Sequence, residues 1–436
     1  MGPLTNWAGN QRYGATALLR PRTLTELRRL VAGAPALRIL NTGHSFNPIA
    51  DCDVLVALDG LEGAQAIEID RETMSVAVGP TVTYAQLAVA LEAEDLALAN
   101  LASLPHISVA GGIATGTHGS GDRLGNLATS VRAVRLLSSE GAEIEIGMSD
   151  PRFSGAVIHL GALGIVVGVT LAVEPSYQLR QDVYLGMDWG TLTENLDAIS
   201  SAGRSVSVFH DFGDQAREVW VKRDPHAEPG ARSELFGAVA ARTPRNPVPG
   251  GDPVNCTPQL GVPGPWHERL PHFRSGFAPS AGDEIQSEWF VAREDGMTAI
   301  QALRELANVI QPILYVAEMR TIAADDLWLS GQYHRNSIAL HFTWRRQPEA
   351  VAKACSEVER TLAPFAPRAH WGKVFGLGAA TIAESFPRLT DFVTLREELD
   401  PTGKFLNTWL RDKLLGAGSG REPGGDRGSD GRVERA

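Results

Sequence analysis

The chain has 436 residues, of which 43% are hydrophobic and 21% charged, as in ordinary globular proteins. One hydrophobic core rarely supports a chain of this length, so we expect two domains. The formal net charge of -11 at pH 7 argues against a broad phosphate-binding surface, and nucleic acid is therefore not expected as a partner.

Up to about residue 175, short apolar runs alternate with turn residues and a few helical stretches, a pattern typical of α+β proteins. Strands are expected at 37–41, 54–58, 66–70 and 134–138, and an amphipathic helix at 84–94. The apolar stretch 157–173 is broken by a histidine and three glycines, so it predicts a turn and a buried strand. No membrane span is expected there, and the first 20 residues lack the apolar core of a signal peptide.

Beyond residue 175, the expected strands alternate apolar and polar residues strictly, at 206–212, 217–223, 286–292, 314–322 and 337–344. Because side chains alternate across a strand, Glu318 and Arg320 share one face, and so do Ser337, His341 and Thr343. One face of this second region is therefore polar. Either it is the solvated face of an ordinary sheet, or it is a reactive site.

Two further segments interrupt this pattern. Residues 224–276 are rich in Pro, Gly and His and form either a flexible linker or an ordered excursion; the need to bury Trp266 and Phe273 favours the excursion. The C-terminal segment 413–436 is expected to be a disordered tail, because apolar residues almost disappear from it.

The three cysteines, Cys52, Cys256 and Cys355, lie far apart in the sequence and make no metal-type cluster, so no metal site is expected. Unclustered cysteines suit a reducing compartment, and we expect a cytoplasmic protein.

Residues 101–121 contain five glycines among small and hydroxyl-bearing residues. Such a segment lets backbone N–H groups turn toward an anion, and a diphosphate is the natural occupant. The spacing fits neither G-x-G-x-x-G nor the P-loop, which argues against nicotinamide and ATP folds. By itself, a tight structural turn explains the glycines equally well.

The stretch NTGHSF, residues 41–46, follows an expected strand and places His44 between a glycine and a serine. Taken alone, His44 could be an ordinary turn histidine. Together with the glycine-rich segment, however, the sequence resembles the FAD enzymes of the vanillyl-alcohol-oxidase type, and within them the aldonolactone oxidoreductases and alditol (xylitol) oxidases. The resemblance is carried by residues 43–47, 103–121, 160–166, 255–273, 323–330, 341–344, 370–375 and 399–407.

The resemblance implies an FAD cofactor bonded through its 8α-methyl carbon to His44. Some relatives add a cysteinyl bond, but no cysteine lies in the glycine-rich segment, so a single histidyl link is expected. The residues implied to line the FAD site are Thr42, Gly43, His44, Ser45, Ser103, Ser108, Gly111, Thr115, Gly116, Thr117, His118, Val166 and His370.

The resemblance also implies substrate contacts from Ser103, Glu318, Arg320, Thr343 and Lys373, and catalytic roles for Glu318, Arg320, His341 and Lys373. Oxidising an alcohol requires a group that takes the hydroxyl proton while a hydride passes to the flavin. His341 suits this task without a shifted pKa, and Lys373 does if burial or nearby cations lower its pKa. The sequence leaves the choice open. Glu318 is expected to orient Arg320 or Lys373 and to accept a substrate hydroxyl.

These expectations combine into an α+β flavoprotein of two domains. The FAD-binding domain is expected over 1–175, completed by a C-terminal return over 376–412. The substrate domain, an antiparallel sheet covered by helices such as 297–310, is expected over 176–375.

The expected reaction is oxidation of a primary hydroxyl of an alditol such as xylitol or sorbitol, with O2 reduced to hydrogen peroxide, by a monomer. The alternatives are an aldonolactone oxidase or dehydrogenase, and a flavin- or sugar-binding protein without turnover.

Overall fold

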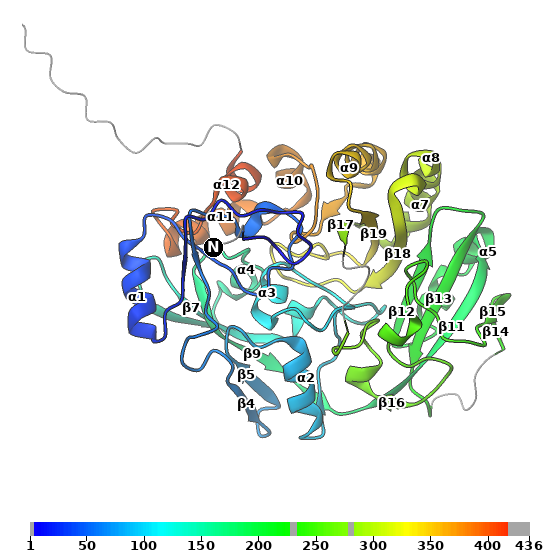
Figure 1. Cartoon of the computed structure of the whole chain (residues 1–436), viewed down its shortest axis with the longest axis horizontal. Helices are drawn as coiled ribbons and strands as arrows, with labels where there is room; N and C mark the ends of the chain where they lie inside the picture. The colour runs from blue at the N-terminus through cyan, green and yellow to red at the C-terminus, as the bar shows by residue number, and fades with distance from the viewer. Residues whose placement is uncertain (1–3, 227–232, 278–282, 417–436) are drawn as a thin grey trace, which may run out of the picture.

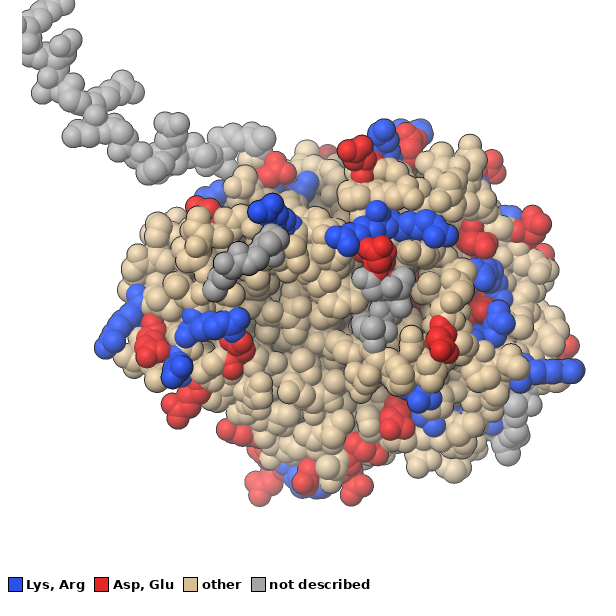
Figure 2. All heavy atoms as spheres, in the orientation of Figure 1, with Lys and Arg blue, Asp and Glu red and all other residues tan. Residues whose placement is uncertain are grey.

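The computed structural model describes residues 4–226, 233–277 and 283–416. Two regions that each carry sheets lie side by side: one is built mainly from the N-terminal part of the chain, the other from residues 178–369 (Figure 1). On the face seen in Figure 2, acidic and basic side chains intermingle around the rim, while the centre is largely uncharged. The negative net charge is therefore not gathered into one patch on this face.

The N-terminal region contains two main sheets. The first is parallel, with the order β1-β3-β2, and consists of β1 (Ala17–Leu19), β2 (Arg38–Ile39) and β3 (Val54–Val56). The second is antiparallel, with the order β4-β5-β9-β7-β8, and consists of β4 (Ile67–Asp70), β5 (Ser75–Val78), β7 (Val131–Leu137), β8 (Glu143–Gly147) and β9 (Ile165–Ala172). Strand β9 is central and mostly buried, as the glycine-broken apolar stretch predicts.

Local signals explain the helices of this region. Helix α1 (Leu24–Gly33) starts where the Thr23 side chain accepts the Glu26 N–H, and its buried residues Leu27 and Val31 are four apart. Helix α2 (Tyr84–Glu92) lies within the predicted helix and begins with a reciprocal capping box between Thr83 and Gln86. The shorter helices are α3 (Val109–Ala114) and α4 (Phe153–Ala156).

The second region is a ten-stranded sheet in which neighbouring strands are antiparallel. Its order is β14-β15-β11-β13-β12-β18-β19-β17-β20, with β16 beside β11. The strands are β11 (Gln178–Asp188), β12 (Ser205–His210), β13 (Gln215–Arg223), β14 (Glu234–Leu235), β15 (Ala238–Ala240), β16 (Gly264–Pro265), β17 (Glu284–Ala292), β18 (Leu314–Ile322), β19 (Ser337–Arg345) and β20 (Arg368–Ala369). The strands predicted by alternation are therefore all present.

Helices cover one face of this sheet, including α5 (Trp189–Glu194), α6 (Leu196–Ser200), α7 (Gly296–Arg304), α8 (Ala307–Ile310) and α9 (Pro348–Leu362) (Figure 1). The predicted helix over 297–310 is wrong in its continuity, because α7 and α8 are separate. A turn of the 3₁₀ type separates them, in which the Leu306 N–H donates to the Leu303 carbonyl three residues earlier.

The excursion within 224–276 is ordered where the structure describes it: Trp266 is fully buried and Phe273 nearly so. The chain then ends in α10 (Ala379–Ser385), α11 (Leu389–Leu399) and α12 (Thr408–Leu415). Asn407, which caps α12, also donates to the carbonyls of Pro48 and Asp51 in the N-terminal region. Because α12 continues to Leu415, the predicted start of the tail at residue 413 is wrong; residues 417–436 lie outside the described ranges.

Candidate active site

A large cavity opens between the two regions, with about 1850 Å³ of space including the solvent at its open mouth. The N-terminal region contributes residues from the segments 38–50, 102–118 and 159–166 to its wall, and the ten-stranded sheet contributes side chains of β12, β17, β18 and β19. All the predicted cofactor and substrate residues line it except Gly116. Gly116 follows α3 with a φ of +66°, and its N–H donates to the Ile113 carbonyl, so it turns the chain and does not line the cavity.

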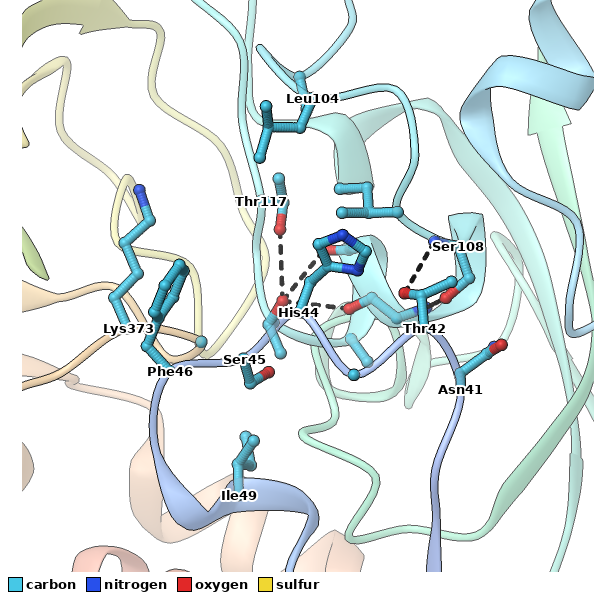
Figure 3. A pocket seen from close by; sticks show the side chains of 18 of the residues that line it. Asn41, Thr42, His44, Ser45, Phe46, Ile49, Leu104, Ser108, Thr117 and Lys373 are labelled. Carbon is cyan, nitrogen blue, oxygen red and sulfur yellow. Dashed lines mark hydrogen bonds between the residues drawn. The ribbon is translucent and has the colours of Figure 1, made fainter. Parts of the chain in front are cut away.

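The segment carrying His44 follows β2 and is fixed by the N-terminal residues. The Asn6 side chain donates to the Ser45 carbonyl at 2.9 Å, and Asn10 donates to the Phe46 carbonyl at the same distance. The Trp7 ring stacks on the His44 imidazole, with centroids 5.3 Å apart. The stacking holds the imidazole in one orientation, and His44 forms part of the cavity wall (Figure 3).

Both ring nitrogens of His44 are buried, and neither has a hydrogen-bond partner among the described residues. Burial, reinforced by the nearby His106, lowers the pKa of His44 to about 4, so the ring is neutral at pH 7. An unpartnered buried imidazole is unfavourable in a finished core. Its place on the wall of the large cavity fits a bound group that His44 itself contacts.

The glycine-rich segment forms α3 and the turn after it. Ser108 caps α3 by accepting the Gly111 N–H, and the Thr115 hydroxyl donates back to the Gly111 carbonyl. A Cβ added at Gly112 would lie 3.1 Å from the Tyr84 ring, so this glycine lets α3 approach α2 closely. The sequence presented a diphosphate cradle and a structural turn as alternatives, and the segment has features of both: Gly111, Gly112 and Thr115 line the cavity.

Gly119 permits a close backbone approach in the same segment. A Cβ there would lie 2.2 Å from Asn100 Oδ1 and 2.4 Å from the Leu101 carbonyl oxygen, so Gly119→Ala should lower the free energy of unfolding by about 1–3 kcal/mol. Gly33→Ala, where a Cβ meets nothing within 4 Å, is the matched control and should be neutral or slightly stabilising. Denaturant unfolding measures both; equal midpoints for the two variants would contradict the close approach.

Strand register gathers the polar side chains on the cavity face. His341 on β19 is paired with Glu318 on β18 and with Glu288 on β17, which places the three side by side. Thr343 is one step along the same face and accepts a 3.2 Å hydrogen bond from His341 Nε2. This polar face lines the cavity, so of the two alternatives for it, the ordinary solvated face does not apply.

Glu288 is the residue of this group that the sequence did not single out. Its side chain is fully buried, and Oε2 lies 2.5 Å from Lys373 Nζ. Oε1 lies 2.9 Å from Arg320 Nη2 and 3.2 Å from His118 Nε2. Burial alone would raise the pKa of Glu288, but Lys373, His118 and Arg320 together hold it well below its usual value. Glu288 is thus the anion that Lys373 and Arg320 share.

Lys373 and His341 form one hydrogen-bonded pair. Lys373 Nζ donates to His341 Nδ1 at 2.7 Å, so His341 carries its own proton on Nε2, toward Thr343. Burial and the Lys373 charge lower the pKa of His341 to about 4, and burial also lowers the pKa of Lys373. The expectation that His341 has an unshifted pKa is therefore wrong, because desolvation and a neighbouring cation both act on it.

Glu318 is held from two sides. Its Oε1 lies 3.4 Å from Arg320 Nε and 2.9 Å from His272 Nε2. Arg320 also donates to the Ser103 hydroxyl at 3.4 Å. The expectation that Glu318 orients Arg320 is supported, whereas the carboxylate that holds Lys373 is Glu288.

His118, Glu288 and His370 bring three potential metal-ligand atoms within 4.8 Å of one another. Glu288 is already paired with Lys373 and Arg320, whose charges repel a cation. His118 Nδ1 donates to the Gly119 carbonyl, and His370 Nδ1 accepts the Gly372 N–H. These contacts organise the cavity wall and do not favour a metal.

Two parts of the chain match known protein families. The FAD binding domain family matches residues 15–147, and the D-arabinono-1,4-lactone oxidase family matches residues 283–413. Among solved structures, the cholesterol oxidase from B. sterolicum has a TM-score of 0.75 at 16% identity and covers 94% of this chain and 96% of its own. Together, the FAD binding domain match and this likeness confirm the predicted two-domain flavoprotein fold.

Two similar sequences are full-length relatives. The alditol oxidase of Streptomyces sp. strain IKD472 is 45% identical, covering 95% of this chain and 99% of the relative. The L-gulono-1,4-lactone dehydrogenase of Mycobacterium tuberculosis is 29% identical, covering 95% of this chain and 100% of the relative. Within the described ranges, no helix has the length and apolar character needed to cross a bilayer. The chain belongs to the alditol oxidase family of FAD-dependent oxidoreductases.

Proposed function

We propose that this protein binds FAD covalently through His44 and oxidises a primary hydroxyl of an alditol, such as xylitol or sorbitol, to the aldose, with O2 reduced to hydrogen peroxide. The observation that carries this proposal is the single cavity in which His44 and the glycine-rich segment face the polar row of Glu288, His341 and Glu318. The 45% identity to an alditol oxidase supports the choice of substrate.

The residues present fit an FAD molecule. Backbone and hydroxyl groups of Ser108, Gly111, Thr115 and Thr117 can hold a diphosphate, and the unpartnered His44 nitrogens support a bond to the flavin. When bound, the flavin supplies the acceptor for the hydride that leaves the substrate carbon.

The chain supplies proton transfer and hydroxyl binding. We assign removal of the hydroxyl proton to the Lys373–His341 pair, in which burial and the Lys373 charge lower the pKa of His341 to about 4, so that the imidazole is neutral at pH 7. Arg320 and Lys373 place positive charge where negative charge develops during oxidation. Glu318, Ser103 and Thr343 bind the remaining substrate hydroxyls.

A lactone substrate is the second candidate, because the lactone oxidase family matches residues 283–413, which include the catalytic strands β17, β18 and β19. Peroxide formation with xylitol against L-gulono-1,4-lactone distinguishes the two. Faster turnover of xylitol supports the proposal, and turnover of the lactone alone overturns it. A protein that binds flavin but oxidises neither substrate would match the binding-protein alternative.

The lowered pKa of His341 gives a pH prediction. A histidine base whose pKa is lowered from the ordinary 6.5 to about 4 stays unprotonated until the pH approaches 4. The enzyme should therefore keep its activity on mild acidification. We expect kcat/KM for xylitol to show no His341 ionisation between about pH 5 and 8. An acid limb with a pKa near 6.5 that disappears in His341→Gln would contradict this expectation.

We also propose a monomeric, cytoplasmic protein. The three cysteines are free, and Cys256 and Cys355 are buried as thiols, which suits a reducing compartment. Light scattering of the purified protein tests the monomer; a dimer mass would overturn it.

A further inference from the structure

Lys222 on β13 is a buried lysine with an unusual environment. Its side chain is almost completely inaccessible, with 1% of the residue exposed, and no described carboxylate lies within ion-pair distance of it. The ammonium donates instead to the Leu270 carbonyl and, at 3.0 Å, to His272 Nδ1. Burial lowers the pKa of Lys222 to about 7. Such a group costs stability, so its contact with His272 calls for an explanation.

The contact fixes the tautomer of His272. Because Nδ1 accepts from Lys222, Nε2 carries the ring proton and donates to Glu318 Oε1 at 2.9 Å. The rings of Phe209 and Trp220 lie edge-on to the imidazole at 5.3 and 5.5 Å, so its plane is fixed as well. The two hydrogen bonds therefore form a chain in which Lys222 donates to His272 and His272 donates to Glu318.

This arrangement bears directly on the cavity. His272 and Arg320 both contact Oε1 of Glu318, which leaves Oε2 to accept a hydroxyl from a ligand. The backbone N–H of His272 also donates to the Ser103 carbonyl at 3.2 Å, so the main chain at His272 is fixed beside a second residue that lines the cavity. Lys222 itself does not line the cavity.

We propose that Lys222 and His272 are positioning residues that hold Glu318 in the orientation in which it accepts a hydrogen bond from a substrate hydroxyl. The inference rests on the proposed function, in which Glu318 binds substrate. If so, substrate hydroxyl recognition depends on two residues besides those that contact the substrate: Lys222 on β13, and His272 from the segment 224–276.

Lys222→Met, which keeps the length of the side chain and removes the donor, tests the proposal. Without the donor, His272 can adopt the other tautomer and direct a lone pair at Glu318. We expect KM to rise about 10- to 100-fold, the usual effect of losing a hydrogen bond to a charged group, with kcat changed by less than about 3-fold. The melting temperature should stay equal or rise, because a buried ammonium is removed.

Two further variants separate positioning from folding. His272→Gln, whose amide N–H can still reach Glu318, should retain a lower KM than His272→Ala. Lys413→Met is the matched control: Lys413 is also buried and donates to a backbone carbonyl, that of Leu377, but does not line the cavity. Its KM should equal that of the wild type.

The assays use whichever of xylitol and L-gulono-1,4-lactone the wild type oxidises. A wild type that does not oxidise xylitol contradicts the proposed function. A Lys222→Met protein with wild-type KM, or one whose KM change is matched by a loss of kcat and melting temperature, overturns the positioning role.

Discussion

His44→Ala protein is expected to release all its flavin into the supernatant when it is precipitated with acid, whereas the wild-type pellet stays yellow. The reason is the environment of His44: both ring nitrogens are buried without a partner, and the ring is neutral and held against Trp7. A neutral imidazole nitrogen can form a bond, and alanine cannot. The expected change is from full to zero retention, and the absorbance of pellet and supernatant measures it.

The control for this experiment is His334→Ala, because His334 is exposed and does not line the cavity. Its flavin should stay in the pellet. Colour that remains in the His44→Ala pellet would place the bond at another residue. Colour released from the wild type would show that the flavin is not covalently held.

Glu288→Gln is expected to lower kcat/KM for the substrate by about 10²- to 10⁴-fold, the range that positioned proton transfer contributes. The substitution keeps the side-chain volume but removes the anion that Lys373 and Arg320 share. Without it, the pKa of Lys373 falls further, and Lys373 loses the contact that aligns it with His341. Steady-state kinetics and the free energy of unfolding are both measured, since breaking a buried ion pair costs about 3–5 kcal/mol.

A matched variant separates the two effects. Glu218 on β13 is also buried, and its Oε1 lies 3.1 Å from Arg245 Nε, but it does not line the cavity. Glu218→Gln should therefore lose stability and keep its activity. If both variants lose activity in proportion to stability, Glu288 has no special role in the chemistry.

The alternation of apolar and polar residues, and the positions of glycines within apolar stretches, predicted much of the fold. The strict alternation over 314–322 and 337–344 became β18 and β19, and the glycine-broken stretch 157–173 became the central strand β9. These signals are local, because a strand with one polar face imposes a period of two on its own residues. The prediction of one continuous helix over 297–310 was wrong, because no Gly or Pro marks the break between α7 and α8.

The site was less accessible to sequence reasoning. Glu288 was missed although it alternates with Gln286, because its importance depends on pairing with His341 across strands, which the sequence of one strand does not contain. Lys222 at a strand end resembles a surface lysine, yet it is buried beneath His272, 50 residues away in the chain. The lowered pKa of His341 likewise depends on Lys373, 32 residues later, and on burial that only the assembled cavity provides.

The most direct test of the proposed function is an anaerobic titration of the purified wild-type protein with xylitol, followed through the visible absorbance of its flavin. The proposal predicts complete bleaching, and recovery of the colour with formation of hydrogen peroxide when O2 is admitted. A flavin that xylitol leaves yellow, but that L-gulono-1,4-lactone bleaches, would contradict the alditol assignment.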